Sequence, residues 1–189
     1  MLCVYVLESK LINILMLMDF FEVVKKRKAI RKYIAGRQIP EADIAKILET
    51  ASLAPSARNL QGYKIFAAKT PTAAEKIFKA CYNQRSDFIK NAALILVFCT
   101  DPEATINQFG ARGEKLYALQ DATIAATFAL LSATALGYAS CWVGNFREKE
   151  IQEILQTPLL PVAAIVIGYS EEHPERPPRK PLEYLAKAI

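Results

Sequence analysis

The stretch EKLYALQDATIAATFALLSATAL, residues 114–136, decides the fold of this 189-residue chain. It contains no proline or glycine and therefore predicts one long helix, and Gly137 directly after it is typical of a residue that follows a helix end. Seven of its residues are alanine, at Ala118, Ala122, Ala125, Ala126, Ala129, Ala133 and Ala135. Because small side chains allow helices to approach closely, we expect this helix at the centre of the fold or at an interface.

Helical and extended patterns alternate on either side of this helix. Apolar spacing predicts helices that begin at Asp19, Pro40, Pro71 and Arg147, and strands over residues 62–68, 92–99, 138–143 and 162–169. The run AALILVFC, residues 92–99, is apolar throughout and suits a strand that is buried on both faces. The Pro-rich tail after residue 170 cannot be helical before Pro181. We therefore predict a single α+β domain over residues 18–189, a small mixed or antiparallel sheet with helices on both faces.

Residues 1–17 are apolar but do not match a targeting segment. Glu8, Ser9 and Lys10 interrupt the about 20 apolar residues that a transmembrane helix needs. A signal peptide would need a basic start and a small-residue cleavage site. Two interpretations stay open: an amphipathic extension that docks on the body, or translation that begins at Met18. The second is favoured because Asp19 begins a coherent helix pattern, and we expect a cytoplasmic protein with no membrane partner.

Composition argues against several chemistries. The single histidine, His173, lies in the Pro-rich tail, which disfavours a Ser-His-Asp triad and a His-based metal site. No two of the four cysteines have zinc-ribbon spacing, so we expect buried, reduced thiols at Cys3, Cys81, Cys99 and Cys141. The net charge of +5 suits a nucleic acid or a phosphorylated cofactor, and its modest size does not decide between them. Residues 110–113 do not complete a dinucleotide-binding fingerprint.

Four short segments are candidates for a functional site. The basic cluster 25–32, KKRKAIRK, is either a solvated helix end or an anion site in which Arg27 makes paired hydrogen bonds to a phosphate. The loop 55–61, PSARNLQ, is either a polar connection or a source of hydrogen bonds to a ligand. Residues 137–145 are either core and turn or a place where Gly144 lets a flat ligand approach the backbone. The fourth candidate is Arg179 with Lys180 near the C-terminus, which would otherwise be an exposed tail.

Taken together and in this order, the four segments resemble the FMN-dependent nitroreductase superfamily, over nearly all of residues 18–185. RKAIR, residues 27–31, is similar to the opening Arg-Arg-Ser-x-Arg of that family. APSARNLQ, residues 54–61, is similar to its Ala-Pro-Ser-x-x-Asn-x-Gln loop. ATALGYASCWVG, residues 133–144, resembles its second signature, and PRKPLE, residues 178–183, resembles its C-terminal end. The chain departs from the pattern at Ala29, where serine is usual, and at Gly62-Tyr63, where Pro-Trp is usual.

The resemblance implies an interlocked homodimer that binds FMN between its subunits. It places Arg27 and Arg179 on the phosphate, and Arg31 beside the ribityl chain or the N1/C2=O edge of the flavin. The other implied flavin contacts are Lys28 and Ala29 near the phosphate, Val143, Gly144 and Asn145 near N5, Asn83 and Gln84 at the pyrimidine edge, and Pro55, Ser56, Ala57 and Asn59 from the partner subunit.

The implied reaction transfers a hydride from NADH or NADPH through flavin N5 to an electron-poor small molecule, such as a nitroaromatic, quinone or enone, by a ping-pong mechanism. It needs no catalytic side chain and no metal, which fits a chain with one histidine. Specialised flavin chemistry such as reductive dehalogenation, and a non-catalytic FMN-binding protein, stay open. A nucleic-acid binder is disfavoured because the basic residues lack interleaved aromatic residues.

Overall fold

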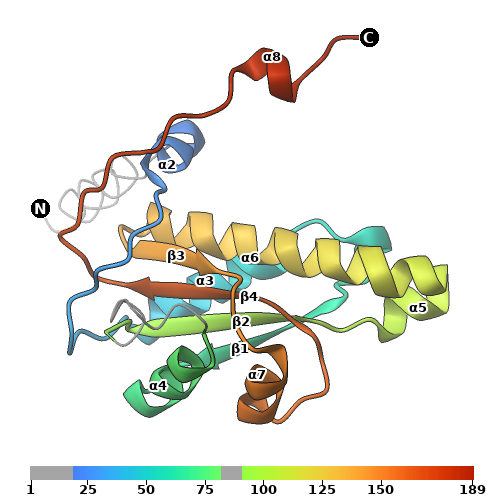
Figure 1. The fold of residues 1–189 in the computed structure, drawn as a ribbon, viewed down its shortest axis with the longest axis horizontal. Helices are drawn as coiled ribbons and strands as arrows, with labels where there is room; N and C mark the ends of the chain where they lie inside the picture. The colour runs from blue at the N-terminus through green and yellow to red at the C-terminus, as the bar shows by residue number, and fades with distance from the viewer. Residues whose placement is uncertain (1–18, 82–90) are drawn as a thin grey trace, which may run out of the picture.

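The computed structural model describes residues 19–81 and 91–189 of the chain. In chain order the elements are α2 (Phe20–Lys26), α3 (Glu41–Ser52), the 3-10 turn η1 (Ala57–Asn59), β1 (Tyr63–Ala68), α4 (Pro71–Ala80), β2 (Leu94–Thr100), α5 (Glu103–Phe109), the π-helical turn η2 (Gly113–Tyr117), α6 (Ala118–Ala135), β3 (Ala139–Val143), α7 (Glu148–Leu155), β4 (Pro161–Gly168) and α8 (Leu182–Leu185). Figure 1 shows a layered α+β arrangement, with the sheet between helices.

The sheet has four strands in the order β1-β2-β4-β3, and every neighbouring pair is antiparallel. The two central strands are apolar and buried, as the run over residues 92–99 predicts. Of the two possibilities that the sequence leaves open, the sheet is therefore antiparallel. A parallel contact occurs only as an isolated bridge, between Ala29 and Ser140, within the part of the chain that the structure describes.

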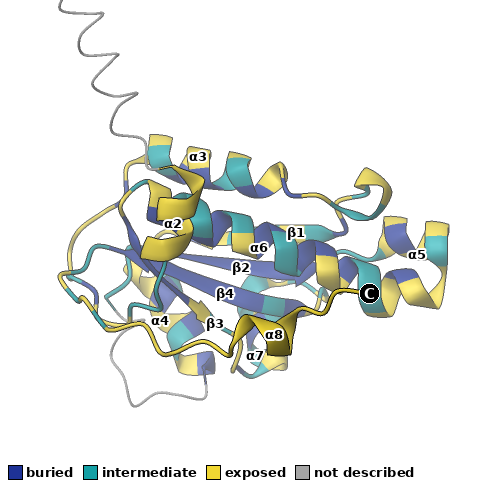
Figure 2. Ribbon diagram, turned by 90° about the horizontal axis from the view of Figure 1, so that it is seen from above, coloured by how far each residue is buried: buried dark blue, intermediate teal, exposed yellow. Residues whose placement is uncertain are grey.

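Two hydrophobic cores lie on opposite faces of this sheet. One core joins α3 and α6 to the strands, and the other joins α4 and α7 to them. Figure 2 shows β2 and β4 buried, whereas α2 and the C-terminal segment are exposed. Helices on both faces confirm the predicted layers. By length and composition Gly113–Ala135 would also qualify as a membrane-spanning helix, but four of its alanines, Ala125, Ala126, Ala129 and Ala133, pack into the first core.

The predicted helix over residues 114–136 is confirmed as one helical run, Gly113–Ala135, whose first turn is π-helical. The π-helical turn comes before Ala118, and the helix α5, which the sequence did not indicate, comes before that turn. The two are in close contact: a Cβ on Gly113 would lie 2.0 Å from the backbone oxygen of Thr105, so only glycine fits there. At the other end the prediction is confirmed, because Gly137 follows α6 with φ +84°.

The chain ends in an extended segment that leaves the body beside α2 (Figure 1). As predicted, it becomes helical only after Pro181, in α8. The exposed side chains of α8 and the terminus include Leu182 at 73%, Tyr184 at 80% and Leu185 at 66% exposure. This segment therefore makes little apolar contact with its own domain.

Candidate functional site

A cavity of about 280 Å³ lies between the segment after α2 and the C-terminal segment. One wall is formed by Arg27, Lys28, Ala29 and Arg31, and the other by residues 174–177 and Arg179. The structure thus brings together five of the residues that the sequence predicts for the flavin site, from parts of the chain that are about 150 residues apart.

Arg176, which the sequence analysis did not select, fastens the C-terminal segment to α2. Its guanidinium donates to the backbone oxygens of Val24, Lys25 and Arg27 at 2.8–2.9 Å. These are carbonyls at the end of α2, which lack partners within the helix. Glu172 adds a second attachment, because its carboxylate accepts the backbone N–H of Arg31 at 2.8 Å. In sequence the only signal for Arg176 is its place in the same Pro-rich segment as Arg179.

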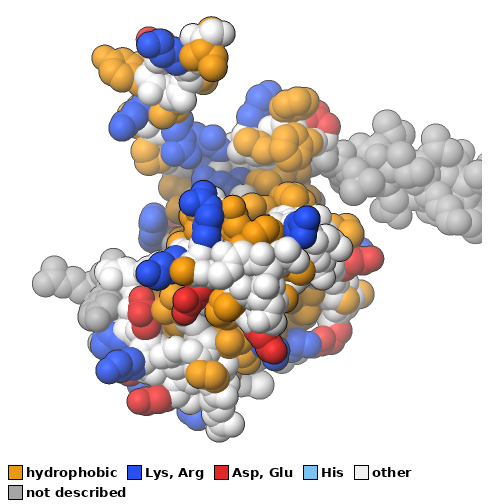
Figure 3. Space-filling view, turned by 90° about the vertical axis from the view of Figure 1, so that its right-hand side faces the viewer, with side chains coloured by type: hydrophobic (Ala, Val, Ile, Leu, Met, Phe, Trp, Pro, Cys, Tyr) orange, Lys and Arg blue, Asp and Glu red, His pale blue; other side chains and the backbone are white. Residues whose placement is uncertain are grey.

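Cations outnumber acidic groups in the cavity lining, where Arg27, Lys28, Arg31, Arg176 and Arg179 face one carboxylate, that of Glu175. Burial lowers the pKa of Arg27, and the neighbouring charges of Arg176 and Arg179 lower it further. Among the described residues, none of these three arginines forms an ion pair with a carboxylate. Figure 3 shows Lys and Arg side chains gathered where the C-terminal segment leaves the body. Such a set of guanidinium groups matches the geometry and charge of a phosphate.

The edge strand β3 pairs with the cavity wall at one residue. Ala29 is bridged to Ser140, and the Ile30 N–H donates to the Ser140 carbonyl at 3.0 Å. Three residues further along is Val143, followed by the exposed Gly144 and Asn145. A Cβ on Gly144 would lie 3.3 Å from Nε1 of Trp142, so glycine keeps this backbone open. The predicted segment over residues 137–145 therefore lies on the same edge of the sheet as the segment with Arg27.

The loop with Pro55, Ser56, Ala57 and Asn59 lies elsewhere in the chain, next to α5. The backbone N–H of Ala57 and that of Gly62 donate to Asp121 in the first turn of α6, at 3.0 and 3.1 Å. The arginine cavity is instead beside the strand that follows the other end of α6. Within one chain, the structure does not bring this loop and the arginines together.

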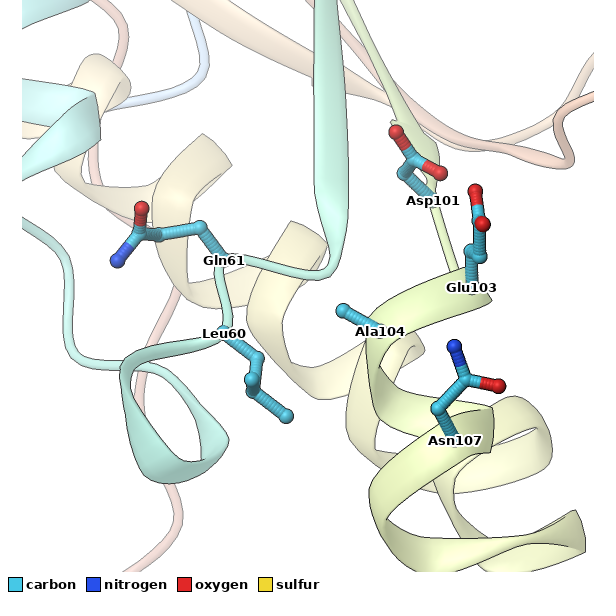
Figure 4. A pocket seen from close by; sticks show the side chains of 6 residues that line it. All are labelled: Leu60, Gln61, Asp101, Glu103, Ala104 and Asn107. Carbon is cyan, nitrogen blue, oxygen red and sulfur yellow. The ribbon is translucent and has the colours of Figure 1, made fainter.

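A second cavity, of about 240 Å³, opens beside this loop. Its walls are Leu60 and Gln61 on the loop side and Asp101, Glu103, Ala104 and Asn107 on the α5 side, as Figure 4 shows. The two carboxylates form no ion pair with any described residue. The surroundings of this loop are therefore acidic, in contrast to those of Arg27.

The three cysteines that the structure describes, Cys81, Cys99 and Cys141, lack the features of nucleophiles, and Cys3 lies outside the described residues. Burial raises the pKa of Cys81 to about 11 and that of Cys99 to about 12. Burial also raises the pKa of Cys141, although Arg31 and Arg27 act in the opposite direction. All three are buried free thiols, as expected. Over residues 19–81 and 91–189 no group of His, Cys, Asp and Glu could hold a metal ion. Asn83 and Gln84 lie outside the described residues.

Comparisons with known proteins find similar sequences and structures. The profile of the Nitroreductase family matches residues 24–85 and 82–169. A relative from Methanothermobacter thermautotrophicus, provisionally named NADH dehydrogenase/NAD(P)H nitroreductase, is 30% identical over 165 residues, which is 83% of this chain and 80% of the relative.

Two solved structures are also similar. A nitroreductase family protein from Clostridium novyi is 32% identical, with TM-score 0.73, over 82% of this chain and 87% of its own. An FMN-dependent nitroreductase from Clostridium difficile is 27% identical, with TM-score 0.72, over 88% and 96%. The chain therefore belongs to the Nitroreductase family of oxidoreductases.

Proposed function

We propose that this chain is an FMN-dependent oxidoreductase that takes hydride from NADH or NADPH and reduces an electron-poor small molecule by a ping-pong mechanism. The observation that carries the proposal is the cavity in which Arg27, Arg176 and Arg179 gather and, among the described residues, form no ion pair with a carboxylate, although Glu175 also lines it. Three clustered cations repel one another, so an anion that enters the cavity is bound strongly. The phosphate of FMN has the charge and the acceptor oxygens for this position.

Each part of the site then has a task. Arg27 and Arg179 hold the phosphate, while Arg176 keeps the C-terminal segment in place through the carbonyls of α2. Gly144 leaves the backbone at the end of β3 open to a flat ring system. When bound, FMN accepts hydride at N5 and passes the electrons on, so the protein needs to bind and orient rather than to supply a base.

The proposed active form is a homodimer with the flavin between subunits. Asp121, which holds the loop with Ser56, and Ala135 at the end of α6 are about 20 Å apart at the rise of an α-helix. A flavin whose phosphate lies among the arginines therefore meets such a loop only if a second copy supplies it. The exposed apolar residues of α8 and of α2, such as Tyr184 and Phe21, provide surface for this contact.

The cavity beside the loop is the proposed entrance for the electron acceptor. In a dimer the loop of the second copy would line the flavin, and the cavity with Asp101 and Glu103 would lie directly next to that loop. Nitroaromatics, quinones and enones are the proposed acceptor classes, because each takes up a hydride or an electron pair without a nucleophile from the protein. No metal is part of this proposal.

The test is the visible spectrum of the purified protein, recorded before and after anaerobic addition of NADH and of NADPH. A flavin spectrum that bleaches with either donor is the expected result. A flavin spectrum that persists with both donors would favour a non-catalytic FMN-binding protein, or flavin chemistry with another donor such as that of a reductive dehalogenase. A colourless protein that does not take up added FMN would overturn the proposal.

A further inference from the structure

Asp121 is the only charged residue of α6, and it is 2% exposed. Its two oxygens accept two different backbone donors: Oδ1 accepts the N–H of Ala57 at 3.0 Å, and Oδ2 accepts the N–H of Gly62 at 3.1 Å. In the described part of the chain it has no cationic partner. A buried carboxylate is costly unless hydrogen bonds compensate it, so these two amides stabilise its charge and it in turn fixes them.

The backbone between those two amides is strained. Arg58, Asn59 and Gln61 have φ values of 49°, 60° and 47°, in the left-handed region that L-residues other than glycine rarely adopt. Ser56 adds one bond across the loop, because its Oγ accepts the N–H of Gln61 at 3.1 Å. Left-handed residues persist only where the surroundings hold them, and here a single carboxylate holds both ends of the strained segment.

Gly62 completes this arrangement. A Cβ at this position would lie 3.0 Å from Cγ2 of Thr105 and 3.3 Å from Oδ2 of Asp121, so a residue larger than glycine fits only if its neighbours shift by a few tenths of an ångström. The family resemblance expects proline here, and proline has no N–H to donate. The glycine at this position is therefore explained by its hydrogen bond to Asp121.

We infer that Asp121 is a positioning residue for the flavin: through Ala57 and Gly62 it holds the loop with Ser56 and Asn59 in the conformation that meets FMN in the second subunit. The inference rests on the proposed function, since it assigns this loop to the flavin site. Asp121 itself does not touch the reacting atoms. It acts by keeping the loop ordered before the flavin arrives, which reduces the entropy lost on binding.

The experiment compares Asp121→Asn with a matched control, Asp43→Asn. Asp43 is a partly buried aspartate on α3 that accepts the O–H of Tyr138 at 2.6 Å and has no contact with the loop. Asparagine at 121 keeps one acceptor oxygen and turns an N–H donor toward the other amide. In flavin-free protein we expect amide hydrogen exchange at Ala57 and Gly62, and trypsin cleavage after the exposed Arg58, to accelerate about tenfold or more in Asp121→Asn. Neither should change in Asp43→Asn.

The second readout is FMN affinity, from the quenching of flavin fluorescence. We expect the Kd of Asp121→Asn to rise about tenfold, while that of Asp43→Asn stays at the wild-type value. A pair of substitutions at Gly62 refines the test, because Gly62→Ala keeps the N–H and Gly62→Pro removes it. Gly62→Pro should weaken FMN binding more than Gly62→Ala in the wild-type background, and this difference should shrink in Asp121→Ala.

The outcomes separate the two proposals. If exchange at Ala57 and Gly62 is unchanged in Asp121→Asn, the carboxylate does not hold the loop and the inference is overturned while the flavin function stands. If the loop loosens but FMN affinity does not fall, the loop does not position the flavin, and the inference is again overturned. If wild-type protein binds no FMN, the proposed function fails and the positioning role fails with it, whatever the exchange data show.

Discussion

The arginine cavity and the loop held by Asp121 are built in opposite ways. Around Arg27, exposed segments come together with like charges facing one another, and the hydrogen bonds that join them use backbone carbonyls of α2. Around Asp121, a buried carboxylate receives two amides and the loop between them is fixed in a strained conformation. In the first region three arginines form no ion pair with a described carboxylate, whereas in the second the carboxylate of Asp121 accepts two backbone N–H groups.

Because of this difference, we expect the two regions to contribute differently to the binding of a phosphorylated ligand. An incomplete cationic cavity gains most from an anion, so it should supply most of the affinity for a phosphorylated ligand. A loop that is already ordered gains little charge interaction from a ligand, so it should supply orientation and selectivity. Substitutions in the arginine cavity and substitutions beside the loop test this difference.

The largest effect is expected for Arg27→Ala. It removes a partly buried guanidinium that has no carboxylate partner among the described residues, and the loss of its charge-assisted hydrogen bonds to a phosphate should raise the Kd for FMN about 30- to 100-fold. Arg37→Ala is the control, because Arg37 stacks on Tyr169 outside the cavity, 3.6 Å from the ring centre. Equal FMN occupancy in the two purified variants would contradict the assignment of the cavity.

A smaller effect is expected for Arg176→Ala, which leaves the phosphate ligands in place but releases the C-terminal segment. We expect the Kd for FMN to rise about tenfold and trypsin to cleave faster after Arg179. Arg176→Lys keeps the positive charge but replaces the guanidinium, one terminal nitrogen of which donates to all three carbonyls, with a shorter ammonium group. If the lysine variant behaves as wild type in both assays, Arg176 contributes charge alone and not position.

Ala29→Ser should strengthen binding. The substitution supplies the hydroxyl that the family resemblance expects at this place in the cavity wall, and one added hydrogen bond to a charged phosphate should lower the Kd for FMN about threefold to tenfold. Ala42→Ser, at an exposed position of α3, serves as the control. An unchanged Kd would show that the phosphate does not approach residue 29.

The smallest effect on the affinity for FMN is expected for substitutions in the cavity beside the loop. The double substitution Asp101→Asn with Glu103→Gln neutralises the cavity beside the loop and should leave the Kd for FMN unchanged. It should raise kcat/KM for an anionic quinone about threefold to tenfold relative to a cationic quinone with the same ring. If the ratio of kcat/KM for the anionic quinone to kcat/KM for the cationic quinone is the same in wild type and variant, the acceptor binds outside this cavity.

The positions of the main elements follow from local patterns in the sequence. The apolar run over residues 92–99 predicted a fully buried strand, and the alanine-rich stretch with Gly137 predicted the helix that packs on it. The motifs around Arg27 and Arg179 also indicated one phosphate site from residues far apart in the chain. The helix α5 was missed because the close contact between Gly113 and Thr105 that stabilises it depends on a turn that no periodicity reveals.

What only the tertiary structure decided is how polar groups are paired. Arg176 and Asp121 carry no motif, and their roles depend on which backbone groups the fold leaves within 3.1 Å of them. The sequence by itself determined which segments are buried and which residue types could hold a phosphate, because hydrophobic periodicity and side-chain chemistry are local properties. The partner of a hydrogen bond depends on the folded path of the whole chain, and for Asp121 that path brings together residues 64 and 59 positions apart.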